Sequence, residues 1–260
     1  MNPTQLINQW LLSPKPSVHF TAAENERFIQ KEVPEVWKMK ETINNQSKNT
    51  FFHTMNVVDN MADFSGHLPG RWAALLHDTG KPVTLAYNEK NEPTFFAHHL
   101  ASETITDEIL HRLQALTETE IAHVKKLIRH HMFPLSTSSY TVTDKTLRRL
   151  IREFNGSVLE LTLLWEADVT TDEPLTRQKT LGSIRRLRTR LLKLQTEDAG
   201  DIFVLPVNGK DICNILKISP SSQVGNMIAH LKNEIISGRL QNDRNTVIEY
   251  LKNNHRSCLK

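Results

Sequence analysis

Apolar side chains recur every three or four residues along most of the chain, which is the spacing of a helix with one buried face. Met55, Val58 and Met61 share one such face. The period predicts helices over residues 51–64, 71–78, 98–115, 117–131, 143–154, 157–170 and 174–195. Residues 83–96 follow no helical period and are predicted as a loop or small hairpin. The pattern therefore predicts an all-α fold.

Prolines and polar breaks divide this helical pattern into three parts. Residues 1–50 are predicted as short helices separated by prolines. The polar string QTEDAGDIF places a soft boundary near residue 196, and three short helices are predicted after it. We therefore expect a helical lead-in over residues 1–50, a central domain over 51–196 and a helical tail over 197–260.

Composition adds only general limits. The chain is 38% hydrophobic and 23% charged, with a net charge of +3, which is ordinary for a globular protein and does not by itself indicate nucleic-acid binding. Its two cysteines lack the close spacing of a disulfide framework. No run approaches the ~18 apolar residues of a membrane span. We expect a cytoplasmic protein without membrane contact, and the oligomeric state is not predicted.

Histidine is unusually frequent, with twelve residues in the chain. His77 and Asp78 are adjacent at the end of an apolar helix, where both side chains can turn toward one divalent ion. His53 lies among apolar residues and is a third candidate ligand. Asp168 ends another apolar helix, and a carboxylate buried there must be paired, coordinated or protonated. The alternative is a capped helix end, with Asp78 accepting backbone hydrogen bonds and His77 a satisfied core residue.

The order His53, then His77-Asp78, then Asp168 resembles the HD superfamily of metal-dependent phosphohydrolases, and HDTGK matches the HD-x-G-K form of its motif. The resemblance implies a helical bundle with a small hairpin after the motif and a C-terminal helical extension. It also implies that Asp78 acts in catalysis as well as in metal binding, and that Lys81 contacts the phosphate in catalysis.

The resemblance extends downstream of the motif. KPVTLAYNEKNEPTFFAHHLAS looks like a subgroup with a hairpin and a histidine element, which implies His99 as a ligand, although Leu100 replaces the acidic residue that often follows. IRHHMFP implies His131 as a further ligand. The alternative for both histidines is the rim of a polar cleft. His98 and His130 are expected to support the ligands or to contact the substrate.

The implied site holds one or two divalent ions. In the two-ion version Asp78 bridges a site made by His53, His77 and Asp168 to a site made by His99 and His131. Mixed nitrogen and oxygen ligands suit Mn, Ni, Co, Fe or Mg, and the pattern does not choose among these metals.

Two long strings, DKTLRRLIREFNGSVLELTLLWEAD and PVNGKDICNILKISPSSQVGNMIAHLKNEIISGRLQNDRNTVIEYLKN, look like the C-terminal half of bacterial CCA-adding enzymes, the tRNA nucleotidyltransferases. This resemblance covers about residues 30–250. The nucleotidyltransferase head and its paired-aspartate motif are missing from the sequence, so we expect no CCA addition. The implied substrates are nucleotides or RNA ends, hydrolysed by 2′,3′-cyclic phosphodiesterase or phosphatase chemistry.

Three alternatives to this activity stay open at this point. The chain can be a module that binds tRNA or another RNA, or a nucleotide sensor without turnover. It can also hydrolyse nucleoside mono- or triphosphates or cyclic dinucleotides. Complete ligands favour hydrolysis over binding alone.

Basic residues offer further candidate contacts. Residues 174–195 contain seven lysines and arginines and no acidic residue, which suits either a track for RNA phosphates or a solvated helix face. Arg148 or Arg149 can bind a phosphate through two hydrogen bonds, or can pair with a nearby acid. His67, His111 and His123 are expected at the surface.

Overall fold

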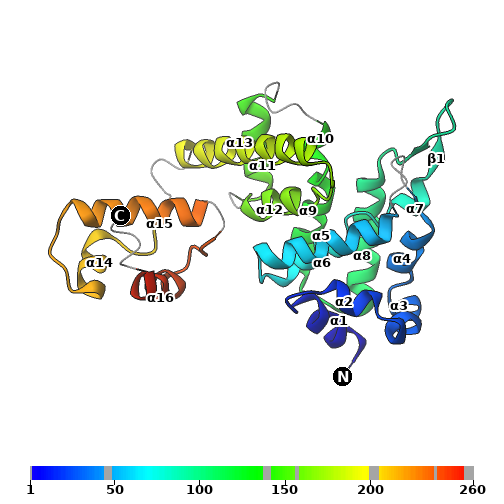
Figure 1. The fold of residues 1–260 in the computed structure, drawn as a ribbon, viewed down its shortest axis with the longest axis horizontal. Coiled ribbons are helices and arrows are strands. Elements are labelled where there is room, and N and C mark those ends of the chain that lie inside the picture. Colours follow the sequence, from blue (N-terminus) through cyan, green and yellow to red (C-terminus); the bar gives the residue numbers. More distant parts are fainter. Residues whose placement is uncertain are drawn as a thin grey trace. The chain divides into compact units, whose positions relative to one another are not determined.

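Figure 1 shows the fold of the chain in a computed structural model. The structure describes residues 2–43, 49–136, 142–155, 158–198, 205–236 and 239–254. Contacts divide the chain into two compact units, Met1–Arg188 and Thr189–Lys260. The domain limits expected from the sequence, at residues 50 and 196, stay predictions.

The first unit is helical, and the all-α prediction is confirmed. In chain order its helical elements are α1 (Pro3–Leu11), α2 (Ser17–Thr21), η1 (Ala23–Asn25), α3 (Glu26–Glu32), α4 (Pro34–Lys38), η2 (Met39–Glu41), α5 (Thr50–Phe64), α6 (Leu68–Leu76), α7 (Lys81–Thr84), α8 (His98–Leu113), α9 (Glu118–His130), α10 (Phe133–Ser136), α11 (Asp144–Glu153), α12 (Leu159–Ala167) and the first part of α13 (Pro174–Asp198). Among the described residues, no helix is long and apolar enough to cross a membrane.

A small hairpin interrupts the helices after the HDTGK string. Strands β1 (Ala86–Tyr87) and β2 (Pro93–Thr94) pair antiparallel. Asn91, in the turn, has a φ of 57°, a left-handed conformation that asparagine tolerates better than most residues. The hairpin predicted between residues 83 and 96 is therefore present, although its strands are short.

Local capping signals set where the central helices begin. Thr117 and Glu120 form a capping box at the start of α9, in which each side chain accepts a hydrogen bond from the other residue's backbone N–H. The Asn49 side chain accepts from the first backbone N–H groups of α5. Pro69 lies in the first turn of α6, where its missing N–H costs nothing. The residue at which each helix begins determines which residues lie near the ends of α5, α6 and α9.

The core of the first unit lies among α5, α6, α9 and α12, which pack on one another. Trp72 and Leu75 of α6, Val58 of α5, Leu127 of α9 and Leu164 of α12 are fully buried. Burying a side chain of this kind contributes about 1.5 to 3 kcal/mol. This core holds the ends of the four helices in fixed positions.

A buried ion pair fastens α13 to α12. Arg188 of α13 is 7% exposed, and its guanidinium donates to a Glu166 carboxylate oxygen at 3.1 Å and to the hydroxyl and carbonyl oxygens of Thr162. One of the seven basic residues predicted to form a phosphate track or a solvated face is therefore structural. Arg177 and Lys179, earlier in the same helix, are exposed.

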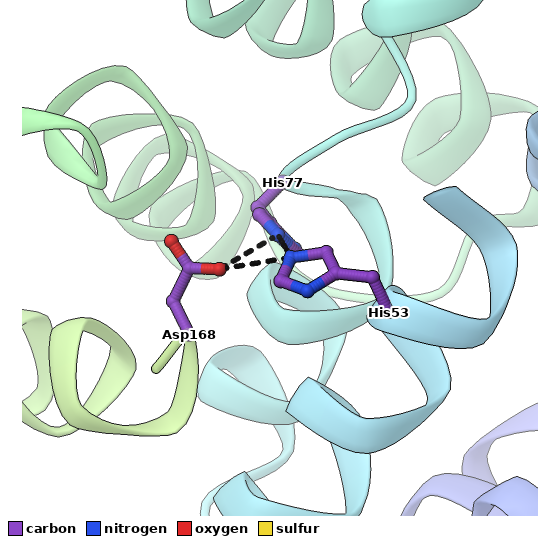
Figure 2. A group of neighbouring side chains, drawn as sticks. All are labelled: His53, His77 and Asp168. Carbon is purple, nitrogen blue, oxygen red and sulfur yellow. Dashed lines mark hydrogen bonds and ion pairs between the residues drawn. The ribbon is translucent and has the colours of Figure 1, made fainter. Parts of the chain in front are cut away.

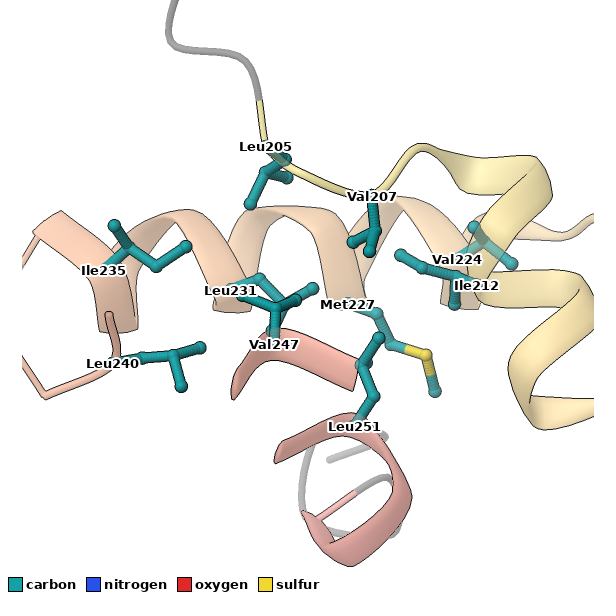
Figure 3. Packing of buried hydrophobic residues seen from close by; sticks show 10 residues of the cluster. All are labelled: Leu205, Val207, Ile212, Val224, Met227, Leu231, Ile235, Leu240, Val247 and Leu251. Carbon is teal, nitrogen blue, oxygen red and sulfur yellow. The ribbon is translucent and has the colours of Figure 1, made fainter. Parts of the chain in front are cut away.

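The second unit has a core of its own. It contains α14 (Gly209–Leu216), α15 (Ser222–Ile236) and α16 (Arg244–Asn254). Figure 3 shows side chains from the three helices meeting, among them Ile212, Leu231 and Leu251, which are fully buried. The Arg244 guanidinium donates to the Asp211 carboxylate, which joins the start of α16 to the start of α14.

Candidate metal centre

Six side chains with nitrogen or oxygen donors gather near the ends of α5, α6, α8, α9 and α12. His53 comes from α5, and His77 and Asp78 follow α6 directly. His98 is the first residue of α8, while His131 and Asp168 are the residues that end α9 and α12. The sequence predicted five of these six residues as metal ligands.

Three of the six side chains form a first cluster (Figure 2). The His53 Nε2 atom lies 3.0 Å from the Asp168 Oδ1 atom, and the His77 Nε2 atom lies 3.5 Å from the same oxygen. The two Nε2 atoms are 3.4 Å apart. Ligand atoms around one divalent ion, each about 2.0 to 2.2 Å from it, have separations of this order.

The other three side chains form a second cluster, and all of them are buried. The His98 Nε2 atom lies 3.3 Å from the Asp78 Oδ1 atom and 3.3 Å from the Nε2 atom of His131. His131 Nε2 lies 3.8 Å from Asp78 Oδ1. This cluster is therefore a second place where one imidazole-rich donor set can hold a cation.

Asp78 faces both clusters at once. Its Oδ2 atom is 3.3 Å from the Nε2 atom of His77 and 3.5 Å from that of His53. Its Oδ1 atom faces His98 and His131 instead. One carboxylate oxygen per cluster is the arrangement that a carboxylate bridging two ions requires.

Hydrogen bonds orient all four imidazoles of the centre. In His77, His98 and His131 the Nδ1 atom lies 2.7 to 2.9 Å from the carbonyl oxygen three residues earlier. A carbonyl only accepts, so Nδ1 carries the proton and Nε2 is left as a ligand atom. The Nδ1 atom of His53 lies 2.8 Å from the Thr170 hydroxyl. Each ring therefore presents Nε2 to the cluster.

The electrostatics of the centre favour a cation. Burial alone lowers the pKa of His77, but Asp78 and Asp168 beside it outweigh burial and raise that pKa to about 10. Burial opposes ionisation of both carboxyls, yet their cationic neighbours, including Lys81 near Asp78, hold both pKa values well below the usual range. Burial and the nearby His77 lower the pKa of His131 to about 3. One buried carboxylate, one partly buried carboxylate and a neutral imidazole fit a divalent ion, which can replace the proton on His77.

A cavity of about 510 Å³ opens over both clusters, a size that fits a small organic ligand. Its lining includes hydroxyl groups, from Thr170, Thr171, Thr176 and Thr180. It also includes apolar side chains, from Phe95, Met132, Pro134, Trp165 and Ile184. The cavity can therefore hold a flat apolar group together with a polar group next to the clusters.

Comparison with known proteins places this centre in a family. Residues 50–177 match the family model of the HD domain. The chain contains an HD domain. HD domains form a superfamily of metal-dependent phosphohydrolases and bind divalent metals, so the candidate metal centre is the expected centre of the domain.

Two relatives are similar to parts of the chain, and one of them is named as a tRNA nucleotidyltransferase. The A-adding tRNA nucleotidyltransferase of Deinococcus radiodurans is 26% identical over 165 residues, covering 62% of this chain and 36% of that protein. The multifunctional CCA protein of Janthinobacterium sp. (strain Marseille) is 31% identical over 114 residues, covering 42% of this chain and 27% of that protein. The chain thus matches well under half of the length of each relative.

The glycine and lysine of the HD motif have separate structural roles. A Cβ atom on Gly80 would lie 2.3 Å from the His98 carbonyl oxygen and 2.6 Å from the Ser102 backbone nitrogen, so only glycine lets the motif pack against the start of α8. The Lys81 ammonium donates to the Asp78 Oδ2 atom at 2.6 Å and lines the cavity. Lys81 therefore lies beside the clusters, and its contact with a phosphate stays a prediction.

The structure corrects the sequence analysis at His99. His98, rather than His99, points into the HD centre, while His99 is half-buried outside the cluster with its ring 6.0 Å from that of His98. Ala97 has a left-handed φ of 58°, so α8 begins directly at His98. Successive helical side chains diverge by about 100°, so only one of the two imidazoles can face the clusters. His98 replaces His99 as the candidate ligand.

Three other predicted substrate contacts lie away from the cavity of the HD domain. The Nε2 atom of His130 contacts a Glu153 carboxylate oxygen at 2.9 Å, so this imidazole has a local structural partner. Arg148 is half-buried and Arg149 is exposed, both on α11. None of the three lines the cavity. The sequence instead missed the cavity threonines, which carry no recognisable motif.

Proposed function

We propose that the HD domain of this chain hydrolyses phosphoester bonds in nucleotides or RNA ends, with two divalent ions. The position of Asp78 is the main support for the proposal, because its Oδ2 atom faces the first cluster and its Oδ1 atom faces the second. His53, His77 and Asp168 would hold one ion, and His98 and His131 the other, with Asp78 shared. Bound ions would supply an acidified water as nucleophile and positive charge for the phosphoryl oxygens.

The side chains of the domain have defined tasks in this proposal. Lys81 lies within 2.6 Å of Asp78 and lines the cavity, so its ammonium can turn to a phosphoryl oxygen that carries extra negative charge in the transition state. The carbonyl-bound Nδ1 atoms keep three imidazoles from rotating. Thr170 does the same for His53.

The cavity and the relatives support the proposed substrate class. A cavity lined by both apolar side chains and hydroxyl groups suits a nucleobase and a ribose, because the base needs dispersion contacts and the sugar needs hydrogen bonds. One relative is named for adding A to tRNA, and the other is named as a CCA protein. We therefore propose 2′,3′-cyclic phosphodiesterase or phosphatase activity, with Mn²⁺, Ni²⁺, Co²⁺, Fe²⁺ or Mg²⁺. Exposed residues of α13, including Arg177 and Lys179, are proposed to contact RNA phosphates.

The test measures hydrolysis of bis-p-nitrophenyl phosphate and 2′,3′-cyclic AMP by the full chain, with each metal in turn. Asp78→Ala should lower turnover by more than about 100-fold, since losing a residue that only orients a ligand already costs 10- to 100-fold. His98→Ala should behave similarly. His99→Ala is the matched control, because it removes the neighbouring imidazole outside the cluster, and it should change turnover by a few-fold at most.

Two results would overturn the proposal. One is the absence of turnover with every metal and both substrates. The other is equal turnover in the full chain and in Asp78→Ala. Binding of tRNA that weakens steeply with salt, without hydrolysis, would instead favour a role in RNA binding.

A further inference from the structure

A second group of metal-ligating side chains lies in the first unit, apart from the HD centre. The Nδ1 atom of His67 lies 2.8 Å from Oε1 of Glu160, and the Nε2 atom of His123 lies 2.6 Å from Oε2 of the same carboxylate. All three ligand atoms lie within 4.8 Å of one another. The two histidines are 93 and 37 residues from Glu160 in the sequence, so the packing of the fold brings them together.

Three helices of the core supply these side chains. His67 immediately precedes α6, His123 lies within α9, and Glu160 lies in the first turn of α12. The same three helices carry HD-centre residues at their other ends. His123 and His131 are eight residues apart, which is about 12 Å along a helix. The second group is therefore a separate site on a shared framework.

The shape of the backbone makes room for the carboxylate. A Cβ atom on Gly70 would lie 2.3 Å from the Glu160 Oε1 atom and 2.7 Å from the Met61 Cε atom. Any larger residue there would displace the carboxylate from its position between the imidazoles. The Glu160 side chain is only 13% exposed, while the His67 ring is 53% exposed. The carboxylate is thus mostly buried, while the imidazole of His67 beside it is open to solvent.

The donor set matches a zinc-class ion. Two imidazoles and one carboxylate are a recurrent set of three protein ligands for Zn²⁺, with water in the fourth position. A tetrahedral ion about 2.1 Å from each ligand separates the ligand atoms by roughly 3.4 Å. The present contacts of 2.6 and 2.8 Å need to lengthen by less than 1 Å to admit an ion. The open side of the His67 ring leaves space for the water.

We propose that His67, His123 and Glu160 bind a divalent ion of the zinc class, which ties the early parts of α6, α9 and α12 together. The competing explanation is a carboxylate hydrogen-bonded to two imidazoles with no affinity for metal. The two explanations differ in the number of ions that the protein binds and in its response to added zinc. Neither difference depends on phosphoester hydrolysis.

The experiment titrates the full, metal-stripped chain with ZnCl₂ and measures bound zinc by elemental analysis. CoCl₂ titration adds a visible spectrum, because tetrahedral Co²⁺ absorbs more strongly than octahedral Co²⁺. His67→Ala should lose one bound ion per chain, together with the tetrahedral cobalt band assigned to this site. Zinc should also raise the thermal midpoint of the unaltered chain more than that of the variant. His111→Ala, which removes an exposed imidazole beside Glu118, is the matched control and should lose nothing.

Several outcomes decide the question. Equal zinc content and equal cobalt spectra in His67→Ala and in the unaltered chain would overturn the proposal. Glu160→Gln keeps the side-chain shape and should weaken zinc binding at this site at least tenfold. His67 is exposed and makes no side-chain cap for α6, so we expect His67→Ala to fold. This variant therefore still tests the proposal if Glu160→Gln misfolds. Loss of zinc in the His111→Ala control as well would also overturn the proposal.

Discussion

Replacing Arg188 by methionine tests how α13 is held in place. Methionine keeps an unbranched apolar stem but removes the guanidinium that donates to Glu166 and to Thr162. The Glu166 side chain is only 8% exposed. Its other observed partner is Arg185, whose Nε atom lies at 3.2 Å and whose side chain is 68% exposed. The variant therefore leaves a buried carboxylate with a weaker, solvent-exposed partner.

The size of the effect follows from these contacts. Removing one member of a buried ion pair costs about 3 to 5 kcal/mol of unfolding free energy. Because Arg185 still contacts the carboxylate, we expect a loss near 3 kcal/mol for Arg188→Met. For a unit of about 190 residues this lowers the melting temperature by roughly 6 to 12 °C. Calorimetry and urea unfolding followed by circular dichroism measure both quantities.

A double variant supplies the control. Replacing both partners by apolar residues of similar volume is often neutral. Arg188→Met combined with Glu166→Met should therefore recover most of the lost stability. A single variant within 1 kcal/mol of the unaltered chain, or a double variant as unstable as the single one, would refute this account of the pair.

Three further predictions concern the HD centre and the second unit. Gly80→Ala should destabilise the chain by about 1 to 3 kcal/mol and lower turnover, because its Cβ atom would overlap the backbone at the start of α8; unchanged urea unfolding would contradict this. Thr170→Val should weaken metal binding 10- to 100-fold in a metal titration, because His53 loses the hydroxyl that orients its ring; unchanged affinity would contradict this. A hydrogen bond from Arg239 lowers the pKa of Glu234, so the pair stabilises the second unit at neutral pH and loses this effect as the pH falls through the lowered pKa. Glu234→Gln should therefore lower the melting temperature at pH 7 and leave it unchanged in acid, and an equal difference at both pH values would contradict the reasoning.

The sequence predicts the helices well because the helical period is strong. Predicted helices at residues 98–115 and 117–131 correspond to α8 and α9 with ends shifted by two residues or fewer. His77 and Asp78 are predictable because they end an apolar helix. Which of His98 and His99 faces the centre is not predictable from the sequence, since it depends on the left-handed conformation of Ala97 before α8. A one-residue difference at a helix start decides which imidazole points inward.

Long-range convergence is the other limit of sequence analysis. His67 and His123 were expected at the surface, and His67 is indeed exposed, yet both contact Glu160. No periodic pattern links three residues on three different helices. The contacts arise only when α6, α9 and α12 pack, so their meeting needs the three-dimensional structure.

The helix ends at the HD centre have a further electrostatic consequence. His77, His131 and Asp168 each cap the C-terminus of a helix. A helix macrodipole places about half a negative charge at that end. Three such ends therefore add to the charges of Asp78 and Asp168 at the floor of the cavity. The three negative helix ends thus stabilise positive charge at the donors of both clusters, whether it is the proton on His77 or a divalent ion of the proposed function.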